Sequence, residues 1–329
     1  MGLEIFLFIV GLALLYFGAE FLVGGSSAIA LRLGITPLVV GLTVVAFGTS
    51  SPELLVCLMA AFSGSDDISV GNIIGSNIAN IILILGCASL IRPLEVHVQA
   101  VRREFPVMVV ASIMMVIVSL DGQITRIEGG ILAAGMVFYL LYAFVSARRG
   151  SKEGQDGAGE DIDELDELAD VDIENANPLL DGLKIVGGIG GLAGGAYLMV
   201  ESARTVAAAI GIPELVIGIT VVALGTSLPE LATSVVAALR GESDISVGNV
   251  IGSNIFNIFL VLGTAAIVAP LVVGQAAIDV DVWIMLFIAV GIWPILRSGH
   301  RVTRLEGVLM LVVYAGYTAY LFIRPEAVV

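Results

Sequence analysis

Long apolar stretches separated by short polar segments occupy nearly the whole chain. Most stretches run for about 20 residues or more, the length that an α-helix needs to cross a bilayer, and they lack the strict alternation of a membrane β-barrel. We therefore predict an all-α polytopic membrane protein with ten transmembrane helices. The expected spans cover roughly residues 3–23, 35–63, 68–91, 104–120, 126–146, 183–203, 212–239, 245–270, 280–297 and 303–323.

The composition favours the same class, because 58% of the 329 residues are hydrophobic and only 14% are charged. Residues 151–182 alone contain twelve of the thirty acids and one base. Such a run of like charges stays in water, so we expect residues 150–182 to form a solvated linker. No basic face is available for nucleic acid. We expect neither an organic cofactor nor an obligate protein partner.

The chain contains an internal repeat. Shifting the sequence by 177 residues places Gly41–Gly86 on Gly218–Gly263 with 30 identities in 46 positions. Each half, residues 1–149 and 183–329, then holds five predicted helices. Because five is odd, the second half must enter the membrane inverted relative to the first.

The basic residues predict the orientation. With the N-terminus outside, twelve Lys and Arg residues fall on the inner side and three on the outer side, the bias expected of cytoplasmic loops. We therefore predict a multi-pass protein of the cell (plasma) membrane with both termini extracellular and the acidic linker cytoplasmic.

A Gly-Thr-Ser-x-Pro-Glu motif lies in the second and again in the seventh expected span, ending at Glu53 and at Glu230. A carboxylate near the middle of a span is costly and normally faces a cavity or a partner. Pro52 and Pro229 should interrupt their helices and free backbone carbonyls at Ala46/Phe47 and Ala223/Leu224. Thr49 and Glu53, like Thr226 and Glu230, are spaced to share one helix face. Such a patch of oxygen atoms suits a hard cation.

A second repeated motif, Gly-Asn-x-x-Gly-Ser-Asn-x-x-Asn, lies in the third and eighth spans. Its residues either coordinate a cation or join helices by hydrogen bonds. We favour coordination for Ser76, Asn80, Ser253 and Asn257. Both alternatives stay open for Asn72, Asn77, Asn249 and Asn254.

The two mid-span glutamates have no obvious counter-charge. A buried acid is often satisfied by a neighbouring base, but no Lys or Arg lies within the core of any expected span. We therefore expect Glu53 and Glu230 to bind cations. Glu20 and Glu201 are expected to be ordinary acids at the membrane boundary.

The two pairs of motifs resemble the α-repeats of the calcium/cation antiporter superfamily, and most of all those of the prokaryotic sodium/calcium exchangers. The resemblance implies a cluster of cation sites at the membrane midplane. Glu53 and Glu230 would be shared by Ca²⁺ and Na⁺, and Asn80 and Asn257 would close the middle. Backbone oxygens would come from Ala46, Thr49, Ala223 and Thr226, and the sodium positions would be completed by Ser50, Ser76, Ser227 and Ser253.

One position departs from part of that superfamily. Some relatives, including the potassium-dependent branch, carry Asp where this chain has Asn257, which favours independence from potassium. We predict a secondary antiporter that exchanges Na⁺ for Ca²⁺ by alternating access. The alternatives are a proton/calcium exchanger of the same superfamily and, less favoured, a cation channel. An enzyme is disfavoured because no His-Glu-x-x-His helix is present.

Overall fold

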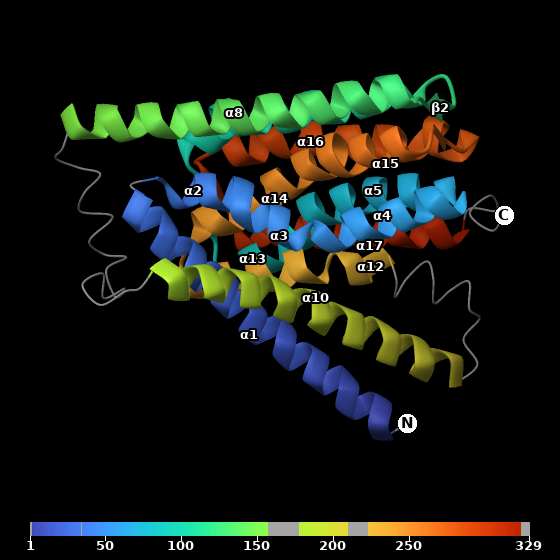
Figure 1. The fold of residues 1–329 in the computed structure, drawn as a ribbon, viewed down its shortest axis with the longest axis horizontal. Coiled ribbons are helices and arrows are strands. Elements are labelled where there is room, and N and C mark those ends of the chain that lie inside the picture. The colour runs from blue at the N-terminus through green and yellow to red at the C-terminus, as the bar shows by residue number, and fades with distance from the viewer. Residues whose placement is uncertain (1, 34, 157–177, 210–222, 324–329) are drawn as a thin grey trace.

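The computed structural model describes residues 2–33, 35–156, 178–209 and 223–323, which form a bundle of helices (Figure 1). Residues 157–177 of the expected acidic linker and the start of the seventh expected span lie outside the described residues. Helix α8 continues to Asp156, and α10 already begins at Pro178. The helices next to the linker are thus longer than the apolar pattern predicted: α8 continues through the polar residues 147–156, and α10 gains the five residues before its expected start.

The first half contains eight α-helices, three π-helical segments (η) and two short strands. In chain order they are α1 (Gly2–Leu33), α2 (Pro37–Val40), η1 (Gly41–Val45), α3 (Ala46–Thr49), α4 (Ser51–Ser63), α5 (Asp66–Ile78), η2 (Ala79–Ile84), α6 (Leu85–Ile91), β1 (Leu94–Glu95), η3 (Ala100–Glu104), α7 (Phe105–Ser119), β2 (Gln123–Ile124) and α8 (Arg126–Asp156).

The described part of the second half repeats this order. Its elements are α10 (Pro178–Ala209), α12 (Ala223–Thr226), α13 (Leu228–Arg240), α14 (Ser243–Phe256), η6 (Asn257–Leu262), α15 (Gly263–Val268), β3 (Leu271–Val272), η7 (Ala277–Asp281), α16 (Val282–Arg297), β4 (Arg301–Val302) and α17 (Arg304–Ile323). The shift of 177 residues that aligns the sequences also aligns α4 with α13, and α5 with α14 to within a residue.

Within the described residues, six helical segments are long and apolar enough to cross a membrane. A seventh arises if the bent pair Pro37–Thr49 and Ser51–Ser63 is one span. The chain is therefore a helical membrane protein. Ten spans stay a prediction, because the expected spans at 104–120, 212–239 and 303–323 are not among these seven.

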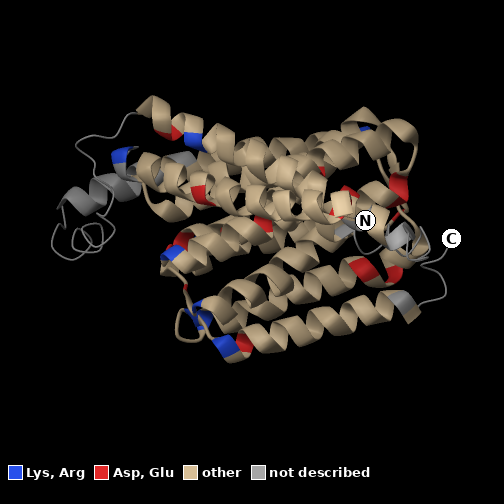
Figure 2. Ribbon diagram, turned by 90° about the horizontal axis from the view of Figure 1, so that it is seen from below, with Lys and Arg blue, Asp and Glu red and all other residues tan. Residues whose placement is uncertain are grey.

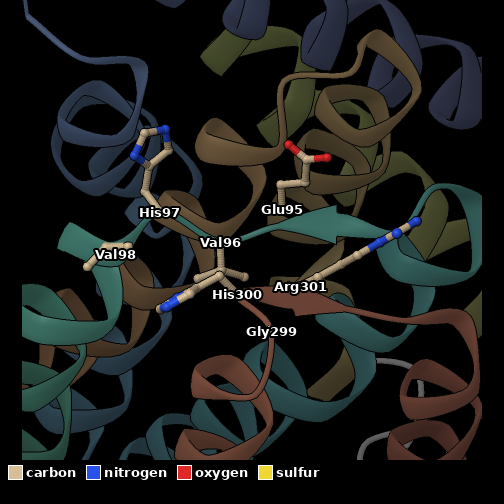
Figure 3. Close-up of a pocket in the computed structure, with 7 residues that line it drawn as sticks. All are labelled: Glu95, Val96, His97, Val98, Gly299, His300 and Arg301. Carbon is tan, nitrogen blue, oxygen red and sulfur yellow. The ribbon is translucent and has the colours of Figure 1, made fainter. Parts of the chain in front are cut away.

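Two small strand pairs join the halves at opposite ends of the helices. β1 pairs with β4 and β2 pairs with β3, both antiparallel. At the first pair, Val96 donates its N–H to the carbonyl of His300 at 2.8 Å, and His97 lies 3.4 Å from Asp244 at the start of α14. Figure 3 shows the shallow pocket there, in which the side chains of His97 and His300 point in different directions. The two histidines therefore do not form a common metal site.

A Thr-Arg-x-Glu-Gly sequence begins α8 and begins α17. In both copies Thr and Glu form a capping box, in which Glu128 accepts from the N–H of Thr125 at 2.8 Å and Glu306 from that of Thr303 at 2.7 Å. These bonds satisfy donors that a helix start leaves free. The sequence thus fixes where α8 and α17 begin.

The arginine of this sequence reaches across to another helix. Arg126 donates to the carbonyl of Val268 at the end of α15, and Arg304 donates to that of Ile91 at the end of α6, both at 3.3 Å. Carbonyls at a helix C-terminus lack partners within the helix and favour a positive charge. Each arginine therefore caps a helix of the opposite half.

The glycine of this sequence permits close packing at the same junction. A Cβ added to Gly129 would lie 2.8 Å from the carbonyl oxygen of Gly263 and 2.8 Å from the Cβ of Ala266. Gly307 approaches the carbonyl of Gly86 in the equivalent place, where an added Cβ would lie 2.9 Å away. Helices α8 and α17 thus lie against α15 and α6 with no room for a side chain.

Helices α1 and α10 form an antiparallel pair on the side of the bundle opposite α8 (Figure 1). A Cβ on Gly195 would lie 2.7 Å from the carbonyl oxygen of Gly11, and one on Gly188 would lie 2.7 Å from that of Gly18. Small residues that let helix backbones touch are typical of membrane interfaces. The pair contributes most of a second apolar cluster, separate from the main core.

Charged residues hold the C-terminal half of α1. Arg32 lies 2.9 Å from Asp181, which Lys184 also contacts at 3.2 Å. Glu20 lies in the interior of the 32-residue α1 and pairs with Arg240 at the end of α13, and its position at the membrane boundary stays a prediction. Figure 2 shows that Lys and Arg gather at one end of the helices.

The two neighbouring glycines Gly129 and Gly130 test the packing of α8 against α15. Gly129→Ala should lower the thermal unfolding midpoint in detergent, because overpacking at this contact costs about 1–3 kcal/mol. Gly130→Ala is the matched control, since nothing lies within 4 Å of an added Cβ there. It should leave the midpoint unchanged or raise it, since alanine favours a helix by up to about 1 kcal/mol. Equal midpoints for the two variants would contradict the close contact.

Candidate functional site

Both motif helices are interrupted at a serine. Between α3 and α4, Ser50 has φ −83° and ψ 5°, and between α12 and α13, Ser227 has φ −88° and ψ 3°. The first interruption bends the helix pair by 44°. Pro52 and Pro229 lie in the first turn of the helix that follows, where a missing N–H costs nothing.

The interruptions place each glutamate in the first turn of a new helix. The partial positive charge of a helix N-terminus stabilises a carboxylate there. The sequence therefore provides a local electrostatic environment for Glu53 and for Glu230 that no basic side chain supplies.

The prediction that Pro52 frees the carbonyls of Ala46 and Phe47 is wrong. The carbonyl of Ala46 accepts the N–H of Ser50 at 3.0 Å, and that of Phe47 accepts the hydroxyl of Ser51 at 2.7 Å. The donor that Pro52 lacks is the one that would reach Gly48, four residues earlier. The hydroxyl of Thr49 also contacts the carbonyl of Ala46, at 3.3 Å.

The predicted site residues are almost all buried. Glu53 and Glu230 are 1% and 0% exposed. The same holds, at 8% exposure or less, for Ala46, Thr49, Ser50, Ser76, Asn80, Thr226, Ser227, Ser253 and Asn257. For Ala223 the structure describes only the backbone, as the first residue of helix α12.

Hydrogen bonds bring the motifs of the two halves together. Ser50 donates to Glu230 at 3.0 Å, the hydroxyls of Ser227 and Ser76 lie 3.2 Å apart, and those of Thr49 and Ser253 lie 3.4 Å apart. Each of these contacts joins residues more than 150 positions apart. The structure therefore unites the two copies of the motifs in one cluster.

Several buried polar atoms in this cluster have no hydrogen-bond partner among the described residues. They are both oxygens of Glu53, Oε2 of Glu230, and the amide oxygen and nitrogen of Asn80 and of Asn257. Buried polar groups are normally satisfied, so unpartnered ones need another ligand. Carboxylate and amide oxygens can accept a cation.

The charge of the cluster is also uncompensated. Among the described residues, no ion pair includes Glu53 or Glu230, and the two carboxylates are near enough to repel each other. No three His, Cys, Asp or Glu side chains gather there or elsewhere in the described part. The donor set consists of two carboxylates with hydroxyls, amides and carbonyls, which favours hard cations over transition metals.

The asparagines whose role stayed open mostly bind protein groups. Asn77 and Asn254 donate to the sulfur of Met285 at 3.8 Å and to the carbonyl of Val250 at 2.7 Å. Asn72 donates to the sulfur of Cys57, and Asn249 donates to the hydroxyl of Ser234. Our sequence reasoning missed Cys57 and Ser234, although the shift of 177 residues that reveals the repeat places one on the other.

Comparison with known proteins identifies the family. The profile of the family described as sodium/calcium exchanger protein matches residues 3–145 and 183–323. The putative antiporter CaxA of Alkalimonas amylolytica is 37% identical over 318 residues, covering 95% of this chain and 97% of the relative. The sodium/calcium exchanger MaX1 of Methanosarcina acetivorans is 31% identical over 344 residues, covering 95% and 97%.

A solved structure agrees with the sequence relatives. The sodium-calcium exchanger NCX_Mj, soaked with Na⁺ and Ca²⁺, superposes with a TM-score of 0.81 at 30% identity and covers 96% of this chain and 98% of its own. The chain therefore belongs to the sodium/calcium exchanger family of the calcium/cation antiporter superfamily, as its motifs predicted. It is a membrane transporter and not an enzyme.

Ca²⁺ binding at this cluster should stabilise the purified protein. At roughly 100 times its Kd, a ligand that binds only the folded state adds about 2.7 kcal/mol, so Ca²⁺ should raise the unfolding midpoint of the wild type. Glu53→Gln and Glu230→Gln should fold without Ca²⁺, because each removes a buried charge, but should lose the Ca²⁺-dependent rise. An equal rise in all three proteins would place the binding elsewhere.

Proposed function

We propose that the chain exchanges Na⁺ for Ca²⁺ across the cell membrane by alternating access at a midplane site built around Glu53 and Glu230. The observation that carries the proposal is the pair of buried carboxylates without an ion-pair partner among the described residues. Membership of the sodium/calcium exchanger family supports the two ions named.

The ligands divide into three groups. Glu53 and Glu230 bind both ions, and Asn80 and Asn257 close the middle of the site with neutral amides. The remaining oxygen atoms come from backbone carbonyls or hydroxyls of Ala46, Thr49, Ser50, Ser76, Ala223, Thr226, Ser227 and Ser253. The contacts of Ser50 with Glu230 and of Ser227 with Ser76 support a single shared site.

Exchange follows from the charge of the site. Two carboxylates balance one Ca²⁺ or two Na⁺, whereas the empty pair would be costly to move past the apolar barrier. Access therefore switches only when cations neutralise the glutamates. Binding of one ion type thus replaces the other instead of adding to it.

We also infer ten helices in two inverted repeats, residues 1–149 and 183–329, joined by a linker at residues 150–182. The strand pairs between the halves and the antiparallel pair of α1 and α10 support this division. The gathering of Lys and Arg at one end (Figure 2) supports a cytoplasmic linker with both termini extracellular.

The test is Ca²⁺ uptake into proteoliposomes loaded with Na⁺. The wild type should take up Ca²⁺ only while an outward Na⁺ gradient exists. Glu53→Gln and Glu230→Gln should each lower uptake by at least roughly 100-fold, which corresponds to about 2.7 kcal/mol. Asp279→Asn is the control, because Asp279 is an exposed carboxylate outside the cluster. Near-normal exchange in both Gln variants would refute the site.

Ion replacement separates the alternatives. Choline in place of Na⁺ should abolish uptake when the pH is equal on both sides. Uptake that persists without Na⁺ and follows an imposed pH gradient would establish a proton/calcium exchanger. Ca²⁺ flux that needs no counter-ion and does not saturate would establish a channel. Either result would overturn the proposed coupling.

A further inference from the structure

Each interrupted helix is tied to the opposite half by one threonine and one asparagine. The hydroxyl of Thr49 lies 3.0 Å from the amide oxygen of Asn249, and that of Thr226 lies 3.1 Å from the amide oxygen of Asn72. An amide oxygen only accepts, so each threonine donates. Both threonines directly precede the serine at which their helix is interrupted.

The amide nitrogen of Asn249 is also occupied. It donates to the backbone carbonyl of Glu230 at 3.3 Å and to the hydroxyl of Ser234 at 3.0 Å. Asn249 therefore connects Thr49 of one half to the helix that carries Glu230 of the other half. Because both ends of its amide serve protein groups, we infer that it acts on the cation through Thr49 and not as a direct ligand.

This contact has a chemical consequence for the threonine. A hydroxyl has one proton and two lone pairs. The hydroxyl of Thr49 also lies 3.3 Å from the carbonyl of Ala46, but its contact with Asn249 is the shorter one. When the proton is held by Asn249 or Asn72, the oxygen can turn only lone pairs toward any other neighbour. The asparagine thereby keeps the proton away from a cation and also holds the interrupted backbone, with its carbonyl, in place.

The two halves build this contact from different atoms. The amide nitrogen of Asn72 donates to the sulfur of Cys57 at 3.4 Å, whereas Asn249 uses the hydroxyl of Ser234. A thiol sulfur is a weaker acceptor than a hydroxyl oxygen. Asn72 is also half-buried, whereas Asn249 is fully buried. The contact around Asn72 is therefore the weaker one.

We propose that Asn249 and Asn72 are positioning residues that orient Thr49 and Thr226 toward the cation. The two halves of the site are unequal because one repeat has Cys57 at the position where the other has Ser234. The proposal rests on the Na⁺/Ca²⁺ exchange proposed above and names residues that act on its site through the threonines. Thr226 is held less firmly by Asn72 than Thr49 is by Asn249. The residue at position 57 therefore affects the affinity of the site for Ca²⁺.

A double-mutant cycle tests the link between Asn249 and Thr49. Asn249→Leu and Thr49→Val should each raise the KM for Ca²⁺ about 10-fold, equivalent to about 1.4 kcal/mol, with a smaller change in kcat. The double variant should be no worse than either single variant, because both remove the same contact. Additive effects near 100-fold would show that Asn249 acts independently of Thr49 and would overturn the proposal.

An exchange of residues between the repeats tests the inequality and avoids a disruptive substitution. Cys57→Ser should lower the KM for Ca²⁺ and Ser234→Cys should raise it, each by roughly two- to threefold, the range of a modest hydrogen-bond difference. For the Asn249→Leu variant of the double-mutant cycle, Asn254→Leu is the matched control on the same helix α14, because Asn254 donates within its own helix. Unchanged KM values in both exchange variants would overturn the inequality.

The two proposals fail in different ways. If the wild type shows no Na⁺-dependent Ca²⁺ uptake, the proposed function is wrong. If it does and Glu53→Gln is inactive, but Asn249→Leu keeps the wild-type KM and the full Ca²⁺-dependent rise in unfolding midpoint, only the positioning role is wrong. The unfolding measurement also separates a binding defect from a protein that fails to fold.

Discussion

The rest of this structure depends on two carboxyl groups, Glu53 and Glu230, that are buried in one cluster without a basic partner among the described residues. Burying a charge is costly unless it is paired, and removing one partner of a buried pair is costlier still. The fold offsets this cost locally by placing Glu53 and Glu230 in the first turn of a new helix, where the partial positive charge of the helix N-terminus favours a carboxylate. The interruptions at Ser50 and Ser227 thus do more than bend the chain, because each one creates the helix N-terminus that stabilises a glutamate.

The sequence predicted which residues form the cluster better than it predicted their hydrogen-bond and ion-pair partners. Two copies of one polar motif in an apolar chain can hide their polar groups only by facing each other, which is why Ser50 meets Glu230 and Ser227 meets Ser76. No local sequence pattern predicts the pairing of Glu20 with Arg240, because the two residues lie 220 positions apart. The prediction of free carbonyls at Ala46 and Phe47 was wrong for a simpler reason. Both carbonyls accept hydrogen bonds from nearby donors, the N–H of Ser50 and the hydroxyl of Ser51.

The apolar pattern also did not predict the lengths of the helices or the contacts between their ends. Polar residues at the end of α8 continue the helix to Asp156 although they cannot lie in lipid. The Thr-Arg-x-Glu-Gly sequence occurs once in each half, but its role depends on carbonyls at the ends of α6 and α15 that only the folded chain brings near. Its four fixed residues serve helix starts and helix contacts, so this repeated motif belongs to the scaffold and the other two belong to the cluster.

The π-helical segments η2 and η6 occupy equivalent places in the halves, at Asn80 and Asn257. A π-turn holds one residue more than an α-turn, and such turns often accompany functional sites. Without that extra residue, everything after it would rotate by about 100° about the helix axis. Gly86 and Gly263 would then turn away from Gly307 and Gly129. The wide turn therefore lets one continuous helix face the buried polar cluster with its first part and the neighbouring helix with its last part. A chain that lost one residue there would lose one of these two contacts.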